Sequence, residues 1–102
     1  MAYYLVATLK LKYGQQRQFN EVMGHLKPAL EREGWKLLGA YQTVVGTLNS
    51  VVDLWEINSP NAVPETLARV AKDPEFAQWA ARLPELLQEE VLQIMTKLPY
   101  SP

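Results

Sequence analysis

The stretch "GTLNSVVDLWEI", residues 46–57, decides the fold of this chain. Its second half is rich in valine, leucine, tryptophan and isoleucine, which favours a strand over residues 50–57. Residues 35–45, "WKLLGAYQTVV", favour another strand, and the short "GTLN" between the two predicts an antiparallel hairpin. One residue does not suit an apolar strand, because Asp53 puts a carboxylate at its centre.

The residues before the hairpin predict a strand and a helix. Residues 3–12 alternate apolar and polar side chains, which is typical of a strand with one buried face. Residues 15–33 repeat apolar side chains every three or four positions, as an amphipathic helix does, and Gly34 is expected to end that helix in a left-handed conformation.

The residues after the hairpin predict helix and then strand. Asn61 and Asp73 are expected to cap two helical segments, and residues 90–98 alternate as a fourth strand. The order strand, helix, strand, strand, helix, strand predicts an α+β fold of the ferredoxin-like βαββαβ type. In it, both helical regions cover one face of a four-stranded antiparallel sheet.

Composition excludes several classes of protein. A chain of 102 residues is expected to form a single domain over residues 1–102. It has no cysteine and a single histidine, His25, so we expect no disulfide, metal site or cofactor. The net charge of -1, without a basic block, argues against a nucleic-acid partner, and no apolar run is long enough for a membrane span. The start of the chain lacks the features of a signal peptide, and the missing cysteines fit a reducing compartment, so we expect a cytoplasmic location.

The face of the sheet that the helices leave uncovered is expected to be apolar. In the second strand, Leu37, Gly39 and Tyr41 alternate with Leu38 and Ala40, so neither set is polar. Soluble monomers rarely expose a large apolar face. We therefore expect a homodimer in which two sheets pack against each other.

The hairpin also resembles a known signature. Members of the NIPSNAP family carry a G-x-L-N-x-V-V-x-L-W run, which "GTLNSVVDLWEI" resembles. Residues 13–41 are similar to the family's first helix and second strand, "DPEF" (73–76) to the start of its last helix, and "LPYSP" (98–102) to its ending. The resemblance implies a dimeric α/β barrel, with two ferredoxin-like subunits joined through their sheets. This sequence departs from the family at Asp53, where many members have a histidine.

Asp53 is the candidate functional residue. It shares one strand face with Val51 and Trp55, since alternate residues project together. One interpretation is an ion pair with Lys10, Lys36 or a helix arginine. The other is a carboxylate that lines a partly enclosed pocket, either as a general base or as a polar anchor.

Aromatic side chains are the candidate walls of that pocket. Tyr41, Trp55, Trp79 and Phe76 are expected to bind a small hydrophobic molecule, or else to be ordinary core residues. His25 is predicted to lie at the boundary of its helix or exposed, away from the apolar stripe.

Two functions follow from these predictions. The family resemblance favours a homodimeric protein that binds a small hydrophobic molecule or acts as a scaffold. The dimeric α/β-barrel superfamily, which the NIPSNAP family resembles, also includes cofactor-free monooxygenases, lactone isomerases and haem-handling enzymes. The alternative is therefore a cofactor-independent monooxygenase or isomerase acting on an aromatic or polyketide-like substrate, with Asp53 as its base.

Overall fold

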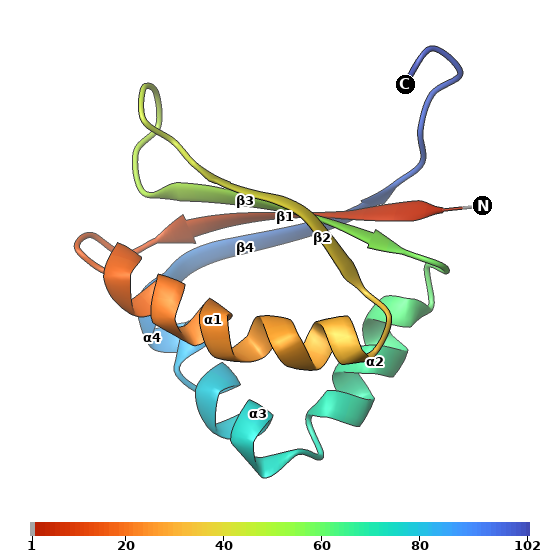
Figure 1. Ribbon diagram of the computed structural model, residues 1–102. Coiled ribbons are helices and arrows are strands. Elements are labelled where there is room, and N and C mark those ends of the chain that lie inside the picture. The colour runs from red at the N-terminus through yellow and green to blue at the C-terminus, as the bar shows by residue number, and fades with distance from the viewer. Residues whose placement is uncertain (1) are drawn as a thin grey trace.

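The computed structural model describes residues 2–102 and consists of one antiparallel sheet with helices on one of its faces (Figure 1). The strands are β1 (Tyr3–Leu11), β2 (Lys36–Gln42), β3 (Ser50–Ile57) and β4 (Leu87–Met95). They lie in the sheet in the order β2-β3-β1-β4. The helices are α1 (Gln16–Arg32), α2 (Ala62–Val70), α3 (Pro74–Ala80) and α4 (Leu83–Leu86). The predicted α+β, ferredoxin-like fold is confirmed.

The alternation in the two central strands determines what faces the helices. In β3 every second residue is buried, and Val51, Asp53, Trp55 and Ile57 form the buried set. Strand β1 pairs with β3 in an antiparallel register that places Ala7 opposite Asp53. The face that carries Asp53 is therefore the one covered by helices, a point that the sequence left open.

A bulge in β2 changes which of its residues face the helices. The register shifts between Leu37, opposite Trp55, and Gly39, opposite Leu54, so Tyr41 pairs with Val52 on the uncovered face. The tyrosine ring lies against Gly39, where an added Cβ would come within 2.3 Å of the Tyr41 hydroxyl oxygen. The expectation that Leu37 and Tyr41 share a face was wrong, because one extra residue in a strand reverses the alternation after it.

The C-terminal part differs from the prediction in its boundaries. Helix α4 precedes the last strand, and Pro84 lies in its first turn, where proline fits well because its missing N–H has no helical partner anyway. Strand β4 then begins at Leu87 and ends at Met95, three residues earlier than predicted at each end. It ends there because its pairing with β1 stops at Tyr4.

The predicted helix ends are confirmed in two of three cases. Gly34 has a φ of 95° after α1, and the Asp73 carboxylate accepts a hydrogen bond from the Glu75 amide at 3.0 Å. Asn61 precedes α2 but its side chain makes no capping hydrogen bond, so its predicted role is wrong. Between Ala2 and Pro102, no helix is long and apolar enough to cross a membrane.

Candidate functional site

One flank of α1 and the inner face of β2 and β3 border a cavity that is partly open to solvent. Residues 16, 20, 23 and 27 of α1 are spaced by four, three and four positions, so they form a single stripe on the helix. This stripe borders a cavity of about 400 Å³, which we call the Lys27 chamber. Its walls combine apolar and polar side chains, among them Phe19, Met23, Trp55, Gln16, Asn20, Lys27, Gln42 and Asp53.

Asp53 is buried in the wall of this chamber without a partner. It is only 4% exposed, and within residues 2–102 its carboxyl group makes no hydrogen bond and no ion pair. Burial removes water from the charged form and raises the pKa of Asp53 from 3.8 to about 6. About half of the group is therefore protonated at pH 6 and about a tenth at pH 7. In the protonated form it can donate a hydrogen bond as well as accept one.

A second, mostly apolar cavity lies on the other side of the same side chains. This apolar chamber of about 240 Å³ lies between the sheet and the helices, with walls that include Leu5, Leu26, Phe76, Leu83 and Leu92. The two chambers have four lining residues in common: Phe19, Met23, Asp53 and Trp55.

The structure brings together only some of the predicted pocket residues. Trp55 lines both chambers with Asp53, and Phe76 lines the apolar chamber. Tyr41 borders the Lys27 chamber, but its ring packs over Gly39 on the uncovered face. Trp79 lines neither chamber.

Trp79 instead joins two helices. Its ring stacks on the imidazole of His25 at a centroid distance of 3.8 Å and an angle of 6°, while the Arg82 guanidinium lies 5.0 Å from the ring centroid. His25 is exposed, as predicted. These contacts hold α3 against α1 and lie outside the chambers.

Comparisons with known proteins identify the family. The chain matches the sequence profile of the NIPSNAP family over residues 4–102. The chain belongs to the NIPSNAP family. No curated protein matches it.

Solved structures show the same fold at low sequence identity. A NIPSNAP family protein of unknown function from Agrobacterium tumefaciens is 23% identical, with a TM-score of 0.84 over 99% of this chain and 92% of that one. An uncharacterised NIPSNAP domain protein from Burkholderia xenovorans is 20% identical, with a TM-score of 0.80 over 98% of each chain. A putative antibiotic biosynthesis monooxygenase from Nitrosomonas europaea is 11% identical, with a TM-score of 0.73 over 99% of this chain and 94% of that one.

Sequence reasoning missed the contribution of α1 to the site of this NIPSNAP chain. The site was predicted from the strands and from aromatic residues, and only the apolar stripe of the helix was assigned a role. The neighbouring flank carries Gln16, Asn20 and Lys27, which follow the helical period together with Met23. A run of polar side chains beside an apolar stripe is usually solvated surface. Here it lines a cavity together with residues of β2 and β3.

The chemistry available in this NIPSNAP site is that of the Asp53 carboxyl group and the Lys27 ammonium group, set among aromatic and amide side chains. Among the described residues, no cluster of three histidine, cysteine, aspartate or glutamate side chains could hold a metal ion. The buried acid can donate a hydrogen bond to a carbonyl oxygen when protonated, and can remove a proton from an acidic carbon when ionised.

Proposed function

We propose that this NIPSNAP chain is a homodimeric binding protein for a small, mostly apolar molecule with a carbonyl group. The ligand occupies the Lys27 chamber, and its carbonyl oxygen accepts a hydrogen bond from protonated Asp53. The observation that carries the proposal is the unpartnered, 4% exposed Asp53 in the wall of a cavity. A cytoplasmic location remains a prediction from the sequence.

The size and lining of the chamber support such a ligand. A cavity of about 400 Å³ falls within the range of about 300–1,000 Å³ that is usual for small-molecule sites. Such sites combine apolar and aromatic walls with a few polar groups that orient the ligand. Trp55 and Phe19 supply the aromatic wall, and Asp53 supplies a buried polar group that lacks an internal partner.

The first experiment compares two ring compounds that differ only in the carbonyl group, 2-tetralone and tetralin. Calorimetry at about pH 5 should show that the wild type binds the ketone roughly 5- to 10-fold more tightly, as one hydrogen bond in a buried site would give. At about pH 8 Asp53 is ionised and cannot donate, so the preference should disappear.

Asp53→Asn is the matched control, because its amide donates a hydrogen bond at every pH. This variant should keep the preference for 2-tetralone at both pH values. No saturable binding of either compound, or a preference that does not depend on pH in the wild type, would contradict the proposal.

A cofactor-independent enzyme is the second candidate, favoured by the pKa of about 6 at Asp53. General bases act best when their pKa lies near the working pH. A carboxylate in an aromatic pocket suits removal of a proton from a carbon next to a carbonyl group, the first step of several isomerisations and oxygenations. The structural similarity to putative monooxygenases shows the fold alone.

Proton exchange tests this second candidate with the same ketone. In D2O, the enzyme hypothesis expects the protein to accelerate exchange at the carbon between the ring and the carbonyl of 2-tetralone, with a rate that rises through about pH 6. Asp53→Asn should abolish the acceleration. Binding without accelerated exchange would leave the binding protein as the function.

The homodimer is supported by the uncovered face of the sheet. A groove lined by Tyr4, Val6, Leu38 and Leu54 crosses this face. In Figure 1 the β2–β3 loop and the C-terminal tail both rise from the sheet on the side opposite the helices. They carry exposed apolar side chains: Val44, Val45 and Leu48 on the loop, and Leu98 and Tyr100 on the tail. A second copy packed between these two arms would cover all of these groups.

Sedimentation at micromolar concentration tests the dimer. The wild type should sediment as a dimer, and Val45→Asp should weaken dimerisation at least tenfold, because the symmetric interface would bury the new charge twice. Val45 is 92% exposed, so the change should not disturb the fold of one copy. Tyr13→Asp, at a 90% exposed site between β1 and α1, is the matched control and should leave the dimer intact. A wild type that sediments as a monomer would contradict the dimer.

A further inference from the structure

The two chambers adjoin each other on the helix side of the sheet, where they share four lining residues. The Lys27 chamber is bordered by β2 and β3, whereas the apolar chamber extends to residues of α4 and β4. They meet at the four shared residues, and Asp53 belongs to the walls of both. A molecule that enters the first chamber therefore reaches Asp53 at the boundary of the second.

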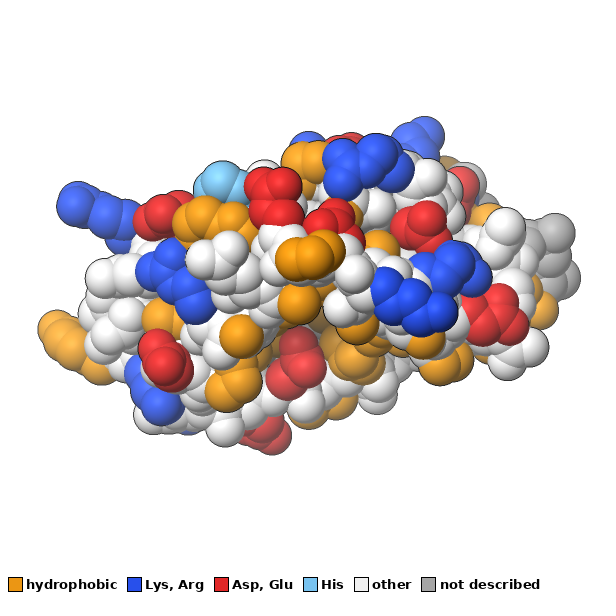
Figure 2. All heavy atoms as spheres, turned by 90° about the horizontal axis from the view of Figure 1, so that it is seen from below, with side chains coloured by type: hydrophobic (Ala, Val, Ile, Leu, Met, Phe, Trp, Pro, Cys, Tyr) orange, Lys and Arg blue, Asp and Glu red, His pale blue; other side chains and the backbone are white. Residues whose placement is uncertain are grey.

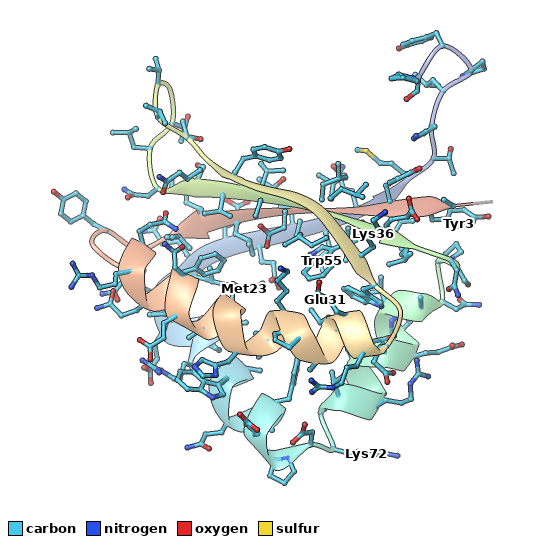
Figure 3. All side chains as sticks on the ribbon, in the orientation of Figure 1. Tyr3, Met23, Glu31, Lys36, Trp55 and Lys72 are labelled. Carbon is cyan, nitrogen blue, oxygen red and sulfur yellow. The ribbon has the colours of Figure 1, made fainter. Side chains whose placement is uncertain are left out.

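Met23 is the adaptable side chain at this boundary. It is half-buried and packs at the edge of the core. Figure 3 shows Met23 on α1 and Trp55 on β3 in the space between the helix and the sheet. Methionine is unbranched with three rotatable side-chain bonds, so it changes rotamer at low cost and fits ligands of different shape.

The apolar chamber is suited to a hydrocarbon chain. Apart from Asp53, the only charged residue in its wall is Glu90 of β4, and the other lining residues are apolar. The helices leave β4 partly uncovered, since Leu92 is 45% exposed although it faces the helix side, opposite Ala7. Figure 2, which views the helix side, shows a hollow where hydrophobic side chains gather around an acidic one.

We propose that the two chambers form one elongated site for a linear alkyl ketone or related acyl compound, with the carbonyl at Asp53 and the tail displacing Met23 to fill the apolar chamber. This inference rests on the proposed binding function and specifies its ligand class. A bicyclic ligand uses the Lys27 chamber alone, whereas a flexible chain uses both.

The test is a homologous series of 2-alkanones, from 2-hexanone to 2-tridecanone, with 2-tetralone as the reference ligand. Each added methylene that enters the apolar chamber should tighten binding by about threefold to fourfold. The affinity should stop rising at the alkanone chain length that fills the apolar chamber. An affinity that does not rise with chain length, while 2-tetralone binds, would overturn the inference.

Ala80→Leu tests whether the tail lies in the apolar chamber. Ala80 of α3 lines that chamber only, so a larger side chain there should shorten the longest alkanone that still gains affinity. The neighbouring Ala81→Leu adds the same atoms at an exposed position and should leave the series as in the wild type. An equal loss of affinity for the long alkanones in the two variants would contradict the placement of the tail in the apolar chamber.

A second measurement does not depend on either variant folding well. Nuclear Overhauser contacts between the terminal methyl of 2-decanone and the wild-type protein should appear at the methyl groups of Leu5 and Leu83. Contacts confined to Lys27-chamber residues would overturn the inference but leave the proposed function standing. If neither 2-tetralone nor any alkanone binds, the proposed function fails first.

Discussion

At the scale of single residues, the position of Asp53 depends on its cross-strand neighbours. Asp53 lies opposite Ala7 of β1 and Ala40 of β2, so small side chains flank the carboxylate on both sides. Cross-strand partners determine how much space a strand residue has. Two alanines leave room for a cavity where larger residues would cover the acid.

The titration of Asp53 gives the first prediction, for the variant Asp53→Asn. The folded pKa of about 6 lies above the unfolded value of about 3.8, so the fold prefers the protonated acid. The wild type should therefore lose stability as pH rises from about 4 through 6, up to about 3 kcal/mol at about 1.4 kcal/mol per pKa unit. Asparagine does not titrate. The free energy of unfolding of Asp53→Asn, relative to that of the wild type, should therefore increase as pH rises from about 4 through 6 and stay constant above that range. Urea unfolding measures this difference.

Asp53→Leu separates charge from packing in the same experiment. This variant also lacks a titrating group, so its difference in free energy of unfolding from the wild type should have the same pH dependence as that of Asp53→Asn. The altered packing should change the size of that difference equally at every pH. A difference between Asp53→Asn and the wild type that is equal at about pH 4.5 and pH 7.5 would contradict the account.

The sequence predicted that Asp53 shares a strand face with Val51 and Trp55, because the strand alternation is regular. It did not predict that this face meets the helices. Both faces of the hairpin carry apolar residues, so hydrophobicity alone did not distinguish them.

At the scale of elements, one hydrogen bond ties α2 to the start of β2. The indole N–H of Trp35 donates to the Thr66 hydroxyl at 3.1 Å, and both residues are buried. Arg69 donates to the same hydroxyl at 3.2 Å and pairs with Glu33 at the end of α1. Thr66 thus connects α2 with the segment that links α1 to β2.

Thr66→Val keeps the shape of this side chain and removes the acceptor. The buried indole N–H would then lack a partner, and we expect a loss of about 1–3 kcal/mol in the free energy of unfolding. Thr47→Val, in the exposed loop after β2, is the control and should change stability by less than about 0.5 kcal/mol. Equal effects of the two variants in urea unfolding would show that the hydrogen bond contributes nothing.

Elements were predictable where the side-chain period was regular over many residues. The pattern of α1 and of β1 places them within about one residue of their observed ends. The bulge in β2 and the four-residue α4 were not predictable, because each depends on a local change of only one to four residues. The period of a short pattern is ambiguous without its tertiary contacts.

At the scale of the whole molecule, the chambers arise from how the layers fit together. Helix α1 buries Phe19, Val22 and Leu26 in the core, while its polar flank lines the cavity beside β2. The sequence predicted the layers but not this cavity, since the distance between a helix and a sheet depends on side-chain volumes from several elements at once. The sequence therefore predicted Asp53 and Trp55 as residues of the candidate site, but not the residues that α1 contributes to it.

The most direct test of the central claim is a carbon-13 NMR titration of the Asp53 carboxyl group, with and without 2-tetralone. The free protein should show a midpoint near pH 6. The ketone accepts a hydrogen bond only from the protonated acid, so by linkage a saturating amount should move the midpoint upward by up to about one pH unit, which corresponds to a roughly tenfold binding preference. A midpoint near 4, or one that the bound ketone leaves unchanged, would contradict the claim that Asp53 is a buried hydrogen-bond donor to a carbonyl ligand.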